Sequence, residues 1–116
     1  MEGTLEAYLS SFFWLILVHY VADFLVQTHW QATNKSKNNV ALFRHVGVYT
    51  LFLLPWGILF ALVNGVLHFV TDYFSSRESS KQFAKGNYKL GFAAVGADQM
   101  IHMKTLLGTL YYLGNY

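Results

Sequence analysis

Long apolar segments separated by short polar ones dominate the pattern along the chain. The segment 40–75 is apolar almost throughout. As one helix it would be about 50 Å long, whereas the hydrocarbon core of a bilayer is about 30 Å thick. The only proline, Pro55, lies near its middle and marks a natural helix break. The pattern therefore predicts helices over about residues 5–26, 40–54, 56–74 and 90–113.

These segments predict an all-α membrane protein, a four-helix transmembrane bundle formed by a single domain of residues 1–116. The segment 40–54 is short for a full crossing. An alternative is therefore one tilted span over about residues 46–67, kinked at the proline. That arrangement would place His45 and His68 on opposite sides of the membrane.

Composition supports a membrane environment. Apolar residues make up 54% of the chain and charged residues 12%, which is roughly half the usual charged share of soluble domains. Aromatic residues reach 18% and lie largely near the ends of apolar segments, as in interfacial belts. The net charge of +2 is too small to predict a nucleic-acid partner. Because there is no cysteine, any metal must be bound by imidazole and carboxylate groups.

Basic residues gather in two polar segments, 27–39 and 75–89, and at the helix ends beside them. The first segment predicts a loop, with a short interfacial helix anchored by Trp30 as an option. Four helices place both segments on one side, and the positive-inside rule puts that side in the cytoplasm and both termini outside. We therefore predict a multi-pass protein of the inner (cytoplasmic) membrane, in contact with membrane lipids and able to form a homo-oligomer. The basic residues concerned are Lys35, Lys37, Arg44, Arg77, Lys81, Lys85 and Lys89.

One short motif occurs twice. Residues 18–24 and 67–73 both read aliphatic, His, aromatic, Val, small, Asp, aromatic. In a helix, the four-residue spacing puts the imidazole and the carboxylate on one face, one turn apart. The repeat predicts two helical hairpins in parallel arrangement, with the first and third helices equivalent. A third pair, in reversed order, is Asp98 and His102.

Seven His and Asp side chains fall at a similar depth in the predicted helices, within about 5 to 18 Å of the cytoplasmic face. Unpaired polar groups are costly in such surroundings, and helical bundles build metal sites in their cores from them. We predict one or two divalent ions, preferably zinc or manganese, with iron(II) also compatible. Asp98 is the predicted general base. The predicted metal ligands are His19, Asp23, His45, His68, Asp72 and His102.

Each of these residues also has an interpretation without a metal. A single His in a membrane helix is often a hydrogen-bond partner for a neighbouring helix. Asp98 could pair with Lys104 or with His102. Tyr49 and Asn64, each one turn from a predicted ligand, could orient it or bond another helix.

The motifs occur in a characteristic order: His19-x3-Asp23-Phe24-x2-Gln27, Lys35, His45, Asn64-x3-His68-x3-Asp72 and Asp98-Gln99-x2-His102. In these, and over nearly its whole length, the chain resembles the small bacterial and phage membrane proteins grouped as domain of unknown function 3307. It is similar, more distantly, to predicted membrane-bound metal-dependent hydrolases with His and Asp in helices. The first resemblance implies no reaction, and the second implies hydrolysis only by analogy.

The leading prediction is an integral membrane metalloprotein that hydrolyses a phosphoester or a lipid-linked substrate, with its site near the cytoplasmic face. In this mechanism the metal lowers the pKa of a bound water, and loop lysines attract an anionic substrate. One alternative is a metal-binding or ion-conducting membrane protein without catalysis. Another is a structural or inhibitory membrane protein that docks on a larger complex.

Overall fold

The computed structural model describes residues 4–116, and the regular elements in that range are all helical. The prediction of an all-α protein is therefore confirmed. A π-helical turn, Val21–Leu25, continues the first helix, and a 3-10 turn, Leu54–Trp56, follows the third. The α-helices are α1 (Leu5–Tyr20), α2 (His29–Asn34), α3 (Asn39–Leu53), α4 (Ile58–Ala84) and α5 (Tyr88–Leu113).

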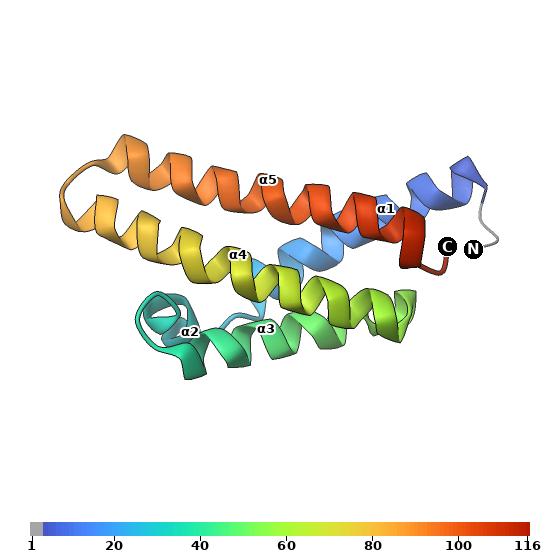
Figure 1. Ribbon diagram of the computed structural model, residues 1–116, viewed down its shortest axis with the longest axis horizontal. Helices are drawn as coiled ribbons and strands as arrows, with labels where there is room; N and C mark the ends of the chain where they lie inside the picture. Colours follow the sequence, from blue (N-terminus) through green and yellow to red (C-terminus); the bar gives the residue numbers. More distant parts are fainter. Residues whose placement is uncertain (1–3) are drawn as a thin grey trace.

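The helices α3, α4 and α5 run side by side in alternating directions along the 49 Å axis of the molecule, and α1 packs against α3 and α5 (Figure 1). At one end, the backbone N–H of Asn115 donates to the carbonyl of Trp56. The ring of Tyr8, near the start of α1, packs edge-on against Tyr116 at the same end. The start of α1, the α3–α4 turn and the C-terminus therefore lie together, and α2 and the α4–α5 turn lie towards the other end.

The predicted break at Pro55 is a reversal of the chain between α3 and α4. Pro55 lies in the 3-10 turn, and Gly57 follows with φ of 116°, a conformation that glycine adopts readily. Beyond the turn the two helices run back along each other, and the rings of Phe43 and Phe69 meet with centroids 6.1 Å apart. The alternative of one kinked span over residues 46–67 is therefore wrong.

The third predicted helix, 56–74, is too short, because α4 continues to Ala84. Polarity alone predicts a loop after residue 74, but the added segment has no glycine or proline and contains several good helix formers. The side chain of Gln82 donates to Glu78 one turn earlier, at 2.8 Å. Gly86, with φ of 80°, ends the helix in a Schellman motif, and its N–H donates to the carbonyl of Phe83.

The interior of the bundle contains both polar and apolar side chains, whereas its outer surface carries many large apolar ones. Among the described residues, ten polar or charged side chains are buried beside eleven apolar ones. The outer faces of the four long helices carry large apolar side chains, including Phe13, Phe43, Val66 and Met100, each at least 65% exposed. Within residues 4–116, two helical segments are long and apolar enough to cross a membrane, with mean hydropathy of 1.5 and 1.4: Leu5–Leu25 and Ile58–Ala84.

Candidate metal centre

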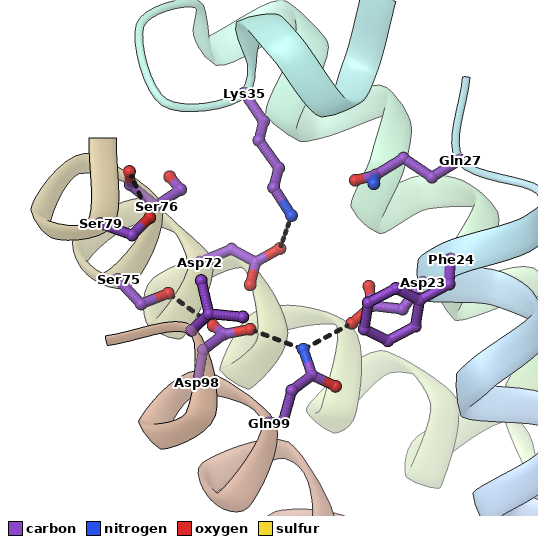
Figure 2. Close-up of a pocket in the computed structure, with 11 residues that line it drawn as sticks. Asp23, Phe24, Gln27, Lys35, Asp72, Ser75, Ser76, Ser79, Asp98 and Gln99 are labelled. Carbon is purple, nitrogen blue, oxygen red and sulfur yellow. Dashed lines mark hydrogen bonds and ion pairs between the residues drawn. The ribbon is translucent and has the colours of Figure 1, made fainter. Parts of the chain in front are cut away.

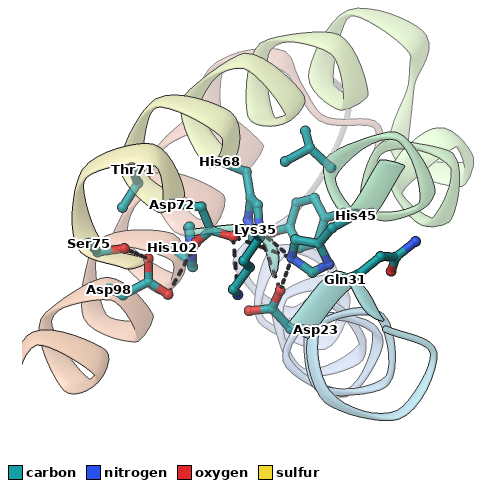
Figure 3. A network of polar contacts seen from close by, with 12 residues as sticks. Asp23, Gln31, Lys35, His45, His68, Thr71, Asp72, Ser75, Asp98 and His102 are labelled. Atoms are coloured by element: carbon teal, nitrogen blue, oxygen red, sulfur yellow. Dashed lines mark hydrogen bonds and ion pairs between the residues drawn. The ribbon is translucent and has the colours of Figure 1, made fainter. Parts of the chain in front are cut away.

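All four long helical segments contribute side chains to one buried cluster of imidazoles and carboxylates (Figure 3). Asp23 lies on the π-helical turn that continues α1, and such turns inside helices are frequent at functional sites. His45 lies in the second turn of α3. None of the clustered His and Asp residues is more than 6% exposed. The other members come in pairs one turn apart: His68 and Asp72 on α4, and Asp98 and His102 on α5.

Four of these side chains each direct one atom towards a common point. The Nε2 atom of His45 lies 2.8 Å from Oδ1 of Asp23 and 3.2 Å from Nε2 of His68. The Oδ2 atom of Asp72 lies 3.3 Å from the same His45 nitrogen and 3.1 Å from that of His68. Oδ1 of Asp23 is also 3.3 Å from Nε2 of His68. We call Asp23, His45, His68 and Asp72 the first ligand set.

The five spacings just given suit a tetrahedral cation site. A regular tetrahedron with edges of about 3.2 Å has its centre about 2.0 Å from each corner, close to ordinary Zn–N and Zn–O distances. Hydrogen bonding accounts for the contacts less well. Oδ1 of Asp23 and Oδ2 of Asp72 are buried, yet neither accepts a hydrogen bond of good geometry within the described structure. Convergence of four donor atoms on one point is the arrangement expected of ligands to a shared ion.

Further donor atoms lie beside the first ligand set. The Nε2 atom of His102 is 3.0 Å from Oδ1 of Asp72 and 3.2 Å from Oδ2 of Asp98. The side-chain amide of Gln99 donates to Oδ2 of Asp98 at 3.0 Å. Of the two pairings open to Asp98 from the sequence, the structure therefore shows the one with His102, while Lys104 is exposed.

His19 lies at the edge of the cluster. Its Nε2 atom is 2.8 Å from the amide oxygen of Gln99 and 3.5 Å from Oδ2 of Asp23, and its Nδ1 atom is 3.3 Å from the hydroxyl of Tyr49. It is not among the residues whose donor atoms converge most closely. Tyr49 stacks on the ring of His68, with centroids 4.0 Å apart, so it supports two histidines at once.

A small cavity of about 100 Å³ opens beside the cluster (Figure 2). Lys35 reaches into it from the end of α2, and its Nζ atom lies 3.6 Å from Oδ2 of Asp72. Ser76 and Gln27 line the same cavity, and their side-chain oxygens are buried without a hydrogen-bond partner in the described part of the chain. Cationic, hydroxyl and carboxylate groups therefore share one small polar space.

Besides Tyr49, three residues in contact with the cluster are absent from the predicted ligand set: Lys35, Ser75 and Gln99. Ser75 donates a hydrogen bond to Asp98, and no signal in the sequence distinguishes it from the neighbouring serines. Lys35 and Gln99 belong to the motifs that carry the family resemblance, which is the signal that marks them. Asn64, by contrast, joins two helices, because its amide donates to the hydroxyl of Thr109 at 2.8 Å.

The fold and the cluster define an all-helical protein with a buried His and Asp centre that could hold a metal ion. The chain belongs to the family described as protein of unknown function (DUF3307), whose profile matches residues 11–114. The resemblance found in the sequence is confirmed, and the matched range includes every predicted ligand. No curated protein and no solved structure matches the chain. The distant likeness to membrane-bound hydrolases stays a prediction.

Proposed function

We propose that this protein is a membrane-embedded, metal-dependent hydrolase of a phosphoester or a lipid-linked substrate. The observation that carries the proposal is the convergence of four donor atoms in the first ligand set. A divalent ion held there supplies Lewis acidity and lowers the pKa of coordinated water towards neutrality. His19 then acts beside the ion, orienting Asp23 directly and through Gln99.

Charge within the cluster can balance that of a divalent cation. With neutral imidazoles, Asp23, Asp72 and Asp98 contribute −3 and Lys35 contributes +1, which leaves −2. Uncompensated charge is costly in a buried site, and one divalent cation neutralises it. Nitrogen and oxygen donors without thiolate suit zinc and manganese.

The exposed surface supports a membrane location. Large apolar side chains point outward from all four long helices, while the clustered His and Asp side chains are buried inside. This distribution is the one expected where lipid replaces water as the surrounding solvent. In our proposal the long helices cross the inner membrane, the basic segments face the cytoplasm, and the termini and the turn at Pro55 face outside.

The cavity beside the cluster supports a substrate with an anionic group. Lys35 supplies positive charge, and the unpaired oxygens of Ser76 and Gln27 provide hydrogen-bonding groups within the same space. A volume of about 100 Å³ suits a phosphoryl group better than a large apolar one. With a single ion in the first ligand set, Asp98 would be the general base, because it lines the cavity beside the cluster.

Metal analysis of detergent-purified protein tests the metal centre. Wild type should contain a divalent ion, His45→Ala and His68→Ala should each lose it, and the double variant should lose little more, because ligands of one ion act as a unit. His29→Ala is the matched control, since His29 is exposed at the start of α2. Equal metal content in all variants, or no metal in any, would end the proposal of a metal centre.

Activity separates the enzyme from a protein that only binds or conducts ions. The metal-loaded wild type should hydrolyse a chromogenic phosphodiester in detergent micelles, and His68→Ala should lose that activity. Metal binding in the wild type without hydrolysis of phosphoesters or of lipid-linked phosphates would favour the alternative function without catalysis.

A further inference from the structure

The two oxygens of Asp72 face different histidines. Oδ2 belongs to the first ligand set, at 3.3 Å from Nε2 of His45 and 3.1 Å from Nε2 of His68. Oδ1 lies 3.0 Å from Nε2 of His102, on the other side of the carboxylate. A carboxylate in this position can bind one cation through each oxygen.

The rings of His68 and His102 set the spacing between the two positions. They stack nearly parallel, with ring centroids 3.8 Å apart and an angle of 13° between the ring planes. Each ring presents its Nε2 atom to Asp72. Cations bound in the ring planes at these two nitrogens would thus be separated by about the stacking distance. That distance falls within the roughly 3.5 to 4 Å between the metals of two-ion hydrolytic sites.

Donor atoms for the second position are present. Oδ2 of Asp98 lies 3.2 Å from Nε2 of His102. Asp23, Asp98 and His102 each bring one donor atom within 4.8 Å of the others. Asp23 therefore belongs to this group and to the first ligand set. Asp72 contacts both sets of residues, because each of its two oxygens faces one of them. We call Asp23, Asp72, Asp98 and His102 the second ligand set.

We propose that the centre binds two divalent ions about 4 Å apart, one in each ligand set, with the carboxylate of Asp72 bridging them. The inference rests on the metal centre of the proposed function and extends it. With neutral imidazoles the site charge changes from −2 to +2 when both ions are bound (−3 + 1 + 4). A site of that charge selects an anionic reacting group. Of the two substrate classes proposed above, this favours phosphoesters. Two ions together stabilise the attacking and leaving oxygens of a phosphoester.

The second ion also changes the role of Asp98. In a one-ion centre Asp98 accepts a proton, and Asp98→Asn lowers the rate while the metal content is unchanged. In a two-ion centre Asp98 is a ligand, and the same substitution removes an ion. Metal content therefore distinguishes the two arrangements independently of activity.

The test is elemental analysis and electron paramagnetic resonance of the full-length protein loaded with manganese(II) in detergent. Wild type and His29→Ala should hold about two ions per chain and give the spectrum of a magnetically coupled pair. His102→Ala and Asp98→Asn should each hold about one ion and give the spectrum of isolated manganese(II). The wild-type spectrum by itself distinguishes one bound ion from a coupled pair. A folding defect in either variant therefore does not prevent the test.

Three other results would overturn the inference. A single ion with an uncoupled spectrum in the wild type would remove the second ion and leave the one-ion centre standing. Two coupled ions retained in folded His102→Ala and Asp98→Asn would place the second ion elsewhere. No bound metal in the wild type would remove the second ion together with the proposed metal centre.

Discussion

The Nζ atom of Lys35 lies 3.6 Å from Oδ2 of Asp72, which places a positive charge against a carboxylate oxygen of the first ligand set. Lys35 caps the C-terminal end of the short helix α2, and Asp72 lies in the buried part of α4. The other end of α2 is held by a capping box in which Thr28 and Gln31 exchange hydrogen bonds. The segment after α1 therefore forms part of the site as well as a connection between helices.

Replacing Lys35 by Gln should strengthen metal binding and weaken binding of an anionic substrate. The ammonium group repels a cation bound at Asp72 and attracts a phosphoryl group in the cavity. We expect a several-fold lower dissociation constant for manganese and a several-fold higher KM for a phosphodiester. Lys37→Gln is the matched control, because Lys37 is exposed in the same segment. Weaker metal binding in Lys35→Gln would indicate that Lys35 acts mainly by holding α2 in place.

Metal affinity should fall as the pH is lowered into the range in which imidazole takes up a proton. A protonated imidazole has no lone pair for a cation, so protons and metal compete for histidine ligands. Two histidine ligands make the loss steeper than one alone, up to about 100-fold per pH unit. Titrations between about pH 5 and 8, with circular dichroism as the control for folding, measure this slope. An affinity independent of pH would argue against histidine ligands.

Gly57→Ala should destabilise the turn between α3 and α4. Gly57 has φ of 116° and ψ of 145°, where a side chain costs about 1 to 3 kcal/mol. Gly96→Ala is the control, because a Cβ atom at this exposed helical position meets nothing within 4 Å. It should be neutral or stabilising by up to about 1 kcal/mol. Thermal unfolding in detergent compares the two, and equal shifts would contradict the strained turn.

Single-cysteine labelling should place the two polar segments on the same side of the membrane. The chain has no cysteine of its own, so variants at Lys37, Lys81 and Pro55 can be labelled individually. In intact cells an impermeant reagent should label the Pro55 variant, while the variants at Lys37 and Lys81 should react only after permeabilisation. Labelling of Lys37 and Lys81 from opposite sides would rule out four crossings.

Much of this architecture is determined locally and could be predicted from the sequence. Apolar segments of helical length and a single proline specify where the long helices lie and where the chain reverses between α3 and α4. The four-residue spacing of His and Asp specifies which side chains share a helix face. The end of α4 could not be predicted in this way, because polarity does not separate a solvated helix from a loop. Gly86, two residues beyond the end of α4, is the better signal.

The two similar motifs show which features sequence spacing specifies and which depend on the packing of the helices. Asp23 follows His19 on a π-helical turn, whereas Asp72 follows His68 on an ordinary α-helix. The equivalence of the first and third helices therefore stays a prediction. Identical spacing led to different surroundings, because the neighbouring helices pack differently on each motif. His19 meets Gln99 and Tyr49, while the His68 ring lies between those of Tyr49 and His102.

By itself the sequence determined that the chain is helical, that its long helices are strongly apolar and that His and Asp side chains fall at a similar level along them. Only the tertiary structure decided which atoms meet. Oδ1 of Asp72 contacts His102, and Oδ2 contacts His45 and His68. Lys35 contacts the same carboxylate through Oδ2. The physical reason is that successive residues differ by about 100° around a helix, so a small rotation of one helix exchanges its contacts. That rotation is set by side-chain packing among helices distant in sequence, which spacing along one chain does not encode.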